Sequence, residues 1–162
     1  MSITPYIMHP NGYFMRPLKG QYSHGRQLVD LYLDQKLPAT YVNKNNESYQ
    51  PDKYIHASDG GSIPVEVQFI PSLRSWAFPY AYYSHDSMYR FHVTYMYSPE
   101  WGEFLPIEIT EDFADKMLLE LLKLEGCSTF WRYAIYYAVK IFGKKVWEES
   151  FDNKIIKQIE EI

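Results

Sequence analysis

The chain has 162 residues, a formal net charge of -4 and a sequence pI near 5.7. An acidic chain lacks the positive potential that attracts the phosphates of nucleic acids, so nucleic acid is not an expected partner. Its single cysteine, Cys127, excludes an internal disulfide and a cysteine-based zinc site, and we expect a small packed residue there. No stretch approaches the roughly 20 apolar residues of a membrane span, so no transmembrane segment is expected.

The first half of the chain indicates strands and turns. Turn signals at 10–12 and at Lys19-Gly20 flank a short apolar run. Residues 27–35 fit a short helix or a strand, and Pro38 ends that element. An extended segment at 54–57 then leads into a glycine-rich turn at 58–62.

The second half changes to a helical period. Pro79 is suited to the first position of a helix that we expect to end near Phe91. Residues 94–106 indicate a loop or hairpin. Thr110 predicts the cap of a helix that ends at Gly126, and the next helix is expected to end before Gly143. The charged tail has isoleucines at helical spacing, which predict a final amphipathic helix (Ile155, Ile156, Ile159 and Ile162).

These elements predict an α+β fold in one domain, 1–162. A small strand-rich N-terminal half packs on a helical C-terminal half, with an antiparallel pair of helices bearing a His-Asp motif and a second aspartate. Within the domain we expect a strand- and turn-rich extension at 1–53, a core at 54–147 and an amphipathic tail at 148–162. The composition is unusual in its aromatic content, 18% with 16 tyrosines, which suits cores and wet interfaces alike. The aromatic residues at 131–137 are expected to be core.

The segment 85–89, His-Asp-Ser-Met-Tyr, is the place where the chain is best suited to chemistry. On a helix, His85 shares a face with Tyr89, whereas Asp86 points elsewhere. On the next helix, Asp115 shares a face with leucines, so its carboxylate should point inward and needs a partner. We predict a His85–Asp115 pair braced by Tyr89, in which the carboxylate orients the imidazole and raises its basicity. The alternative is a structural hydrogen-bond network between two helices.

The glycine-rich turn is the second candidate. Asp59, Gly60 and Gly61, with Ser62, could supply oxygens to a hard cation, and an ordinary Asx turn is the alternative. His56 and His92 are expected to be isolated surface or strand histidines.

These motifs, in this order, resemble a phage and prophage family known as domain of unknown function 1353. The matching residues span Tyr54–Trp147 and consist of four motifs, namely the turn 59–64, the segment 85–89, Ala114-Asp115, and the tyrosine-rich stretch 136–143 followed by Trp147. The resemblance implies a phage origin and a location in the host cytoplasm or the virion. It supplies no reaction. The loop at 95–108 is longer than the family usually carries.

The site is also similar to that of secreted calcium-dependent phospholipases, which carry His-Asp-x-x-Tyr on one helix and an aspartate on its antiparallel neighbour. The similarity implies that His85 activates water, that Asp115 orients it, and that Asp86 binds calcium with carbonyls of Gly60 and Gly61. Those enzymes are disulfide-stapled and place their glycine loop close to the helix, whereas this chain has no disulfide and its turn lies further upstream.

The motifs and resemblances lead to two alternative functions, one enzymatic and one not, and the sequence does not decide between them. The first is a phage-encoded accessory protein with a hydrolase-like site at His85, Asp115 and Tyr89, assisted by calcium, acting on an ester of a lipid or another envelope component. The second is a non-catalytic virion or host-interaction protein, including a host-defence antagonist, which binds a phage or host protein or its own copies. A catalytic His85 has to lie in an open cleft, whereas a sealed His85 favours the second function.

Overall fold

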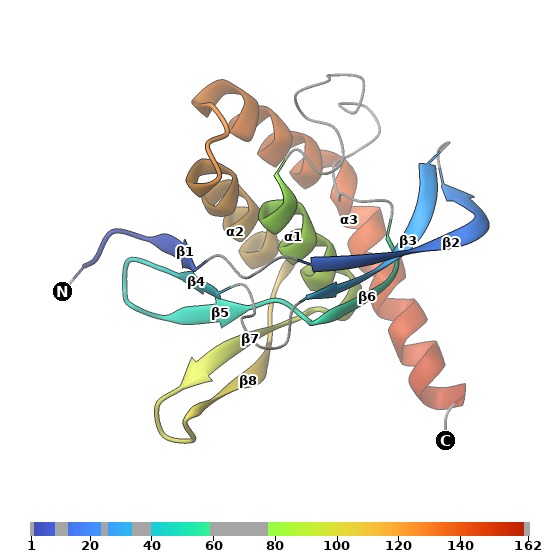
Figure 1. The fold of residues 1–162 in the computed structure, drawn as a ribbon, viewed down its shortest axis with the longest axis horizontal. Coiled ribbons are helices and arrows are strands. Elements are labelled where there is room, and N and C mark those ends of the chain that lie inside the picture. The colour runs from blue at the N-terminus through green and yellow to red at the C-terminus, as the bar shows by residue number, and fades with distance from the viewer. Residues whose placement is uncertain (1, 9–12, 24–25, 34–39, 59–77, 161–162) are drawn as a thin grey trace.

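The computed structural model describes residues 2–8, 13–23, 26–33, 40–58 and 78–160. Within them the chain forms eight strands and three helices, so the predicted α+β fold is confirmed. The three helices lie beside one another, and the strands lie along one side of them (Figure 1).

One sheet has five antiparallel strands in the order β1-β4-β5-β7-β8. The strands are β1 (Tyr6–Met8), β4 (Thr40–Val42), β5 (Ser48–Gln50), β7 (Val93–Ser98) and β8 (Glu103–Glu108). Strands from the predicted extension therefore pair directly with a hairpin from the predicted core. The segment expected to be a loop or hairpin is this β7–β8 hairpin.

The second sheet has three antiparallel strands in the order β2-β3-β6, namely β2 (Tyr13–Ser23), β3 (Arg26–Leu33) and β6 (Tyr54–Ser58). The ambiguous segment near residue 27 is thus a strand. The turn predicted at Lys19-Gly20 is wrong, because β2 continues through it with an irregular register between Pro17 and Tyr22. Gly20 adopts a φ of 78°, which glycine reaches without strain.

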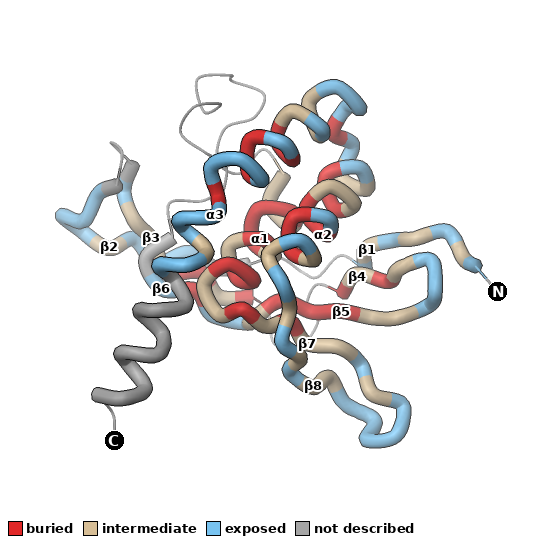
Figure 2. Tube along the Cα trace, turned by 180° about the vertical axis from the view of Figure 1, so that it is seen from behind, coloured by how far each residue is buried: buried red, intermediate tan, exposed pale blue. Residues whose placement is uncertain are grey.

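Helix α1 (Pro79–Phe91) is the centre of the molecule and has the bounds that the sequence predicts. On one side its residues join α2, α3 and β5 in the main core. On the other side Tyr83 packs with Leu31, Leu33 and Ile55 of the three-stranded sheet. Figure 2 shows buried residues concentrated in α1 and in the parts of α2, α3 and β5 near it.

Helix α2 (Glu111–Leu124) begins at the predicted cap, where the Thr110 hydroxyl accepts a hydrogen bond from the Phe113 amide. Helix α3 is a single element, Thr129–Glu160. The prediction that a helix ends before Gly143 is therefore wrong. The tail expected to form a separate final helix is the continuation of α3.

Replacing Thr110 with alanine should lower the free energy of unfolding by about 1 kcal/mol, because the Phe113 amide loses its acceptor. Calorimetry should show a melting temperature lower by roughly 2–4 °C. Thr110→Ser keeps an acceptor and should melt close to the wild type. Equal losses in both variants would contradict the cap.

Candidate functional site

The predicted His-Asp-Tyr constellation is assembled between α1 and α2. His85 and Tyr89 are one turn apart on α1, so both side chains leave the helix on the same face. His85 Nε2 lies 3.0 Å from Asp115 Oδ1, and the Tyr89 hydroxyl donates a hydrogen bond of 2.7 Å to the same oxygen. Because an ionised carboxylate only accepts hydrogen bonds, we assign the proton of the first contact to His85 Nε2. The three residues meet with Asp115 as the shared acceptor.

These three side chains are enclosed by protein. The exposed fraction is 0% for His85, 2% for Asp115 and 4% for Tyr89. Burial, and then the hydrogen bond to Asp115, raises the pKa of the Tyr89 hydroxyl, so this group stays protonated and keeps donating. His85 does not lie in an open cleft, and the enclosure favours a structural role for the network.

Helix α3 covers the Tyr89 side of the network. Trp147 packs edge-to-face on Tyr89, with ring centroids 5.2 Å apart. A Cβ atom at Gly143 would lie 2.7 Å from the Tyr89 hydroxyl oxygen. The glycine therefore lets the Tyr89 side chain lie close to the α3 backbone, and it does not end the helix. His92 stacks on Trp147 at 3.6 Å, and its Nε2 lies 2.9 Å from the Trp147 carbonyl oxygen. The expectation that His92 is an isolated residue is therefore wrong.

Three buried polar atoms of α1 make no hydrogen bond within the part of the chain that the structure describes: Tyr83 Oη, His85 Nδ1 and Asp86 Oδ2. Such an atom costs about 1–3 kcal/mol when it is left unpaired. His85 Nδ1 is the nitrogen that would take a proton from water in the hydrolase hypothesis, because Nε2 is engaged by Asp115. The unpaired Nδ1 is the feature of the network that favours chemistry.

Asp86 is engaged by a cation of its own helix. Its Oδ1 accepts a hydrogen bond of 3.2 Å from Arg90 Nε. Among the described residues no three His, Cys, Asp or Glu side chains gather as they would around a metal ion. The Arg90 guanidinium offsets part of the charge of Asp86, and Asp86 Oδ2 makes no hydrogen bond with the described residues. Asp59, Gly60 and Gly61 lie outside the described residues, and calcium binding stays a prediction.

A second His-Asp pair, which the sequence did not indicate, lies on the three-stranded sheet. Asp30 is buried on β3, and its two carboxylate oxygens lie 2.7 Å from Arg16 and 2.7 Å from His56 Nδ1. His56 is an exposed residue of strand β6, as the sequence predicts, and it is paired with a buried aspartate. Its imidazole and the Arg16 guanidinium are both exposed, whereas the Asp30 carboxylate that they share is buried.

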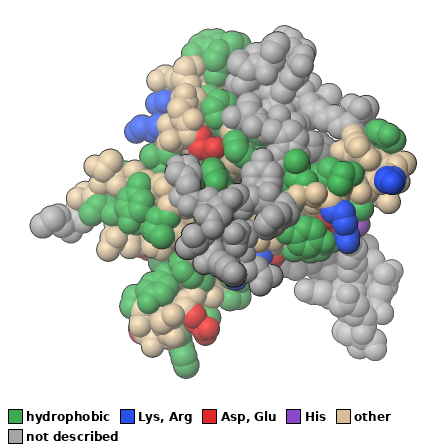
Figure 3. Space-filling view, viewed as in Figure 1, with side chains coloured by type: hydrophobic (Ala, Val, Ile, Leu, Met, Phe, Trp, Pro, Cys, Tyr) green, Lys and Arg blue, Asp and Glu red, His purple; other side chains and the backbone are tan. Residues whose placement is uncertain are grey.

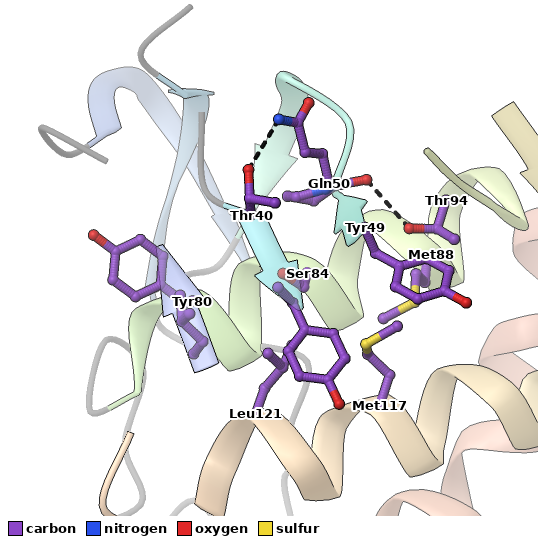
Figure 4. Close-up of a pocket in the computed structure, with 12 residues that line it drawn as sticks. Thr40, Tyr49, Gln50, Tyr80, Ser84, Met88, Thr94, Met117 and Leu121 are labelled. Carbon is purple, nitrogen blue, oxygen red and sulfur yellow. Dashed lines mark hydrogen bonds between the residues drawn. The ribbon is translucent and has the colours of Figure 1, made fainter. Parts of the chain in front are cut away.

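A small cavity lies between the five-stranded sheet and helices α1 and α2 (Figure 4). Its volume is about 20 Å³, which is room for about one water molecule. Gln50 lies at its polar edge: the side-chain amide donates to Thr40 Oγ1 at 3.0 Å, and the backbone carbonyl accepts from Thr94 Oγ1 at 3.2 Å. The side chains around it do not include His85 or Asp115, so it does not give access to the His-Asp pair.

Comparison of the chain with family models, with curated proteins and with solved structures found no match. The resemblance to domain of unknown function 1353 therefore stays a prediction that rests on the motifs alone. None of the described helices combines the length and the apolar character needed to cross a membrane.

Replacing His85 with alanine should lower the free energy of unfolding by about 3 kcal/mol, because the buried Asp115 carboxylate loses one of its two donors. A chain of this size should then melt roughly 6–12 °C lower. The control is Lys116→Ala, which breaks a pair whose two side chains are both exposed, Lys116 with Asp112, and should cost at most about 1 kcal/mol. If His85→Ala melts within 2 °C of the wild type, about what 1 kcal/mol would shift it, the network is not structural.

Replacing Gly143 with alanine should also destabilise the protein, by about 1–3 kcal/mol, because the new methyl group overlaps the Tyr89 hydroxyl. Tyr89→Phe removes that oxygen, so the alanine should cost less in this background. A double-mutant cycle measured by chemical denaturation gives the coupling. If the losses in free energy of unfolding are additive, the Tyr89 hydroxyl is not the reason that alanine is destabilising at position 143.

Proposed function

We propose that the chain is a non-catalytic interaction protein in which the His85–Asp115–Tyr89 network is scaffolding. The observation that carries the proposal is the enclosure of His85, since a general base has to reach both water and substrate. The network joins α1 to α2 through Asp115, and Tyr89 extends it to α3 through Trp147. A virion or host partner is the expectation that the motif resemblance adds.

The β7–β8 hairpin is the surface that we assign to the partner. It projects from the body of the molecule (Figure 1), and the Trp101 side chain in its turn is 73% exposed. Behind it, Tyr97 and Phe104 are cross-strand partners whose rings meet edge-to-face at 5.4 Å. An exposed tryptophan in a hairpin that also has an aromatic cross-strand pair has the character of an interface hot spot.

The charge of the hairpin indicates the kind of partner. Residues 93–108 include three exposed glutamates and no lysine or arginine (Glu100, Glu103 and Glu108). Figure 3 shows acidic side chains beside hydrophobic ones on one face of the hairpin. Complementarity then favours a protein that offers an apolar pocket for Trp101 within a basic surface.

A photo-crosslinking amino acid at position 101, introduced in the cells where the protein acts, should join the chain to one partner. The same probe at position 116, an exposed site on α2, is the control and should not capture that protein. The purified partner should bind Trp101→Ala about 30-fold more weakly than the wild type, the effect of losing a hot spot of 2 kcal/mol. Equal affinity for both would overturn the assignment of the hairpin.

A hydrolase-like function is the second candidate, because His85 Nδ1 is buried and makes no hydrogen bond among the described residues. In that mechanism Nδ1 takes a proton from a water molecule as the water oxygen attacks an ester carbonyl. The protonated His85, held by Asp115, then returns the proton to the leaving alcohol. The reaction requires water and substrate to reach an imidazole that is enclosed in this structure.

Hydrolysis of p-nitrophenyl butyrate, with and without calcium chloride, separates the two functions. The proposal of a non-catalytic protein predicts that the wild type releases p-nitrophenol no faster than His85→Ala or Asp115→Asn. Circular dichroism at the assay temperature shows whether each variant is folded. A wild-type rate that both folded variants lose would establish the hydrolase function instead.

A further inference from the structure

The first half of helix α3 has an apolar face that is exposed within the part of the chain that the structure describes. Four side chains at a spacing of three, four and four residues are 72%, 41%, 55% and 69% exposed, in the order Phe130, Tyr133, Tyr137 and Ile141. At 100° per residue they fall within an arc of about 80°. The structure shows that the predicted burial of Tyr133 and Tyr137 is wrong. The buried side of the same helix includes Ile135 and Val139, which lie in the core with α1 and α2.

The same spacing of apolar residues continues in the sequence of the second half of α3. The helix runs to Glu160, and the spacing extends through a lysine and a glutamate to further apolar residues, namely Lys144, Glu148, Phe151, Ile155 and Ile159. Ile162 continues the spacing in the sequence, beyond the described residues. Figure 1 shows this part of α3 extending past the body of the molecule. A helix that leaves the body with a row of apolar positions gains stability from a packing partner.

The order of residues along this face is symmetric about Val146. Each residue on one side has a counterpart at the same distance on the other, and the pairs are Phe130 with Ile162, Tyr133 with Ile159, Tyr137 with Ile155, Ile141 with Phe151, and Lys144 with Glu148. When two identical helices cross antiparallel about a twofold axis through position 146, these are the residues that meet. Apolar residues then meet apolar ones, and the lysine of each copy meets the glutamate of the other.

The charged pair also selects the orientation. A parallel pair in register would bring Lys144 against Lys144 and Glu148 against Glu148, and like charges at such positions are destabilising. The antiparallel pair instead makes two Lys–Glu contacts at its centre. A twofold interface of this kind uses one surface twice and forms a closed dimer.

We propose that two copies of this chain pair through α3 as an antiparallel helical dimer, with Lys144 of each copy against Glu148 of the other. The interface uses the face that runs from Phe130 to Ile159. It is separate from the β7–β8 hairpin, so each dimer presents two hairpins to its partners.

Sedimentation equilibrium of the full chain tests the dimer, because one copy has a mass of 19.3 kDa. The wild type should have twice that mass, and Ile141→Glu should have the mass of one copy. The matched control is Phe142→Glu, which changes the adjacent residue, also exposed and apolar but about 100° away around the helix. It should remain a dimer. A monomeric wild type, or equal masses for the two variants, would overturn the proposal.

Charge reversal tests the orientation on variants whose melting shows that they are folded. Lys144→Glu alone and Glu148→Lys alone should each raise the dissociation constant of the dimer at least tenfold. The double variant, with both changes in one chain, should return it to within a factor of three of the wild type. An antiparallel dimer predicts this rescue because the two residues meet across the axis. Unchanged dissociation constants in the single variants, or no rescue in the double one, would overturn the antiparallel arrangement.

Discussion

A carboxylate can be buried in a protein core only when donors are held against it, and the packing of the three helices follows from how Asp115 obtains its donors. His85 and Tyr89 reach the same oxygen from one face of α1, which fixes the rotation of α1 against α2. Tyr89 in turn fixes α3, because its ring packs on Trp147 and its hydroxyl fills the space that Gly143 leaves open. The central helix thus positions α2 through Asp115 and α3 through Tyr89.

Whether the protein is an enzyme or a binding protein depends on whether the His85–Asp115–Tyr89 network is catalytic or structural. The network's atoms have the arrangement that a hydrolase uses: a carboxylate contacts one imidazole nitrogen, and the other nitrogen makes no hydrogen bond with the described residues. Its surroundings are those of a core, since His85 has no exposed surface. Chemistry requires access in addition to geometry, and the exposed features of the molecule lie elsewhere, at the Trp101 hairpin and along α3. The function proposed from this structure is therefore binding.

The sequence predicted what depends on local spacing and missed what depends on distant contacts. Pro79 and the Thr110 cap located the starts of α1 and α2, and helical spacing brought His85, Tyr89 and Asp115 together. Gly143 was interpreted as the end of a helix, because its contact with Tyr89 cannot be read from neighbouring residues. The His56–Asp30 pair depends on strand pairing across 26 positions, which alternation alone does not determine. Likewise, spacing showed that the tyrosines of α3 share a helix but not which of them face outward.

Chemical modification of the histidines tests the sealed network most directly. Diethyl pyrocarbonate acylates accessible imidazole nitrogens, and mass spectrometry locates each product. In the native protein His56, whose side chain is 61% exposed, should react within minutes, whereas His85 should stay unmodified until the protein is unfolded. Modification of native His85 at a rate comparable to that of His56 would contradict the account, because it would show that His85 Nδ1 is open to solvent and able to act on a substrate.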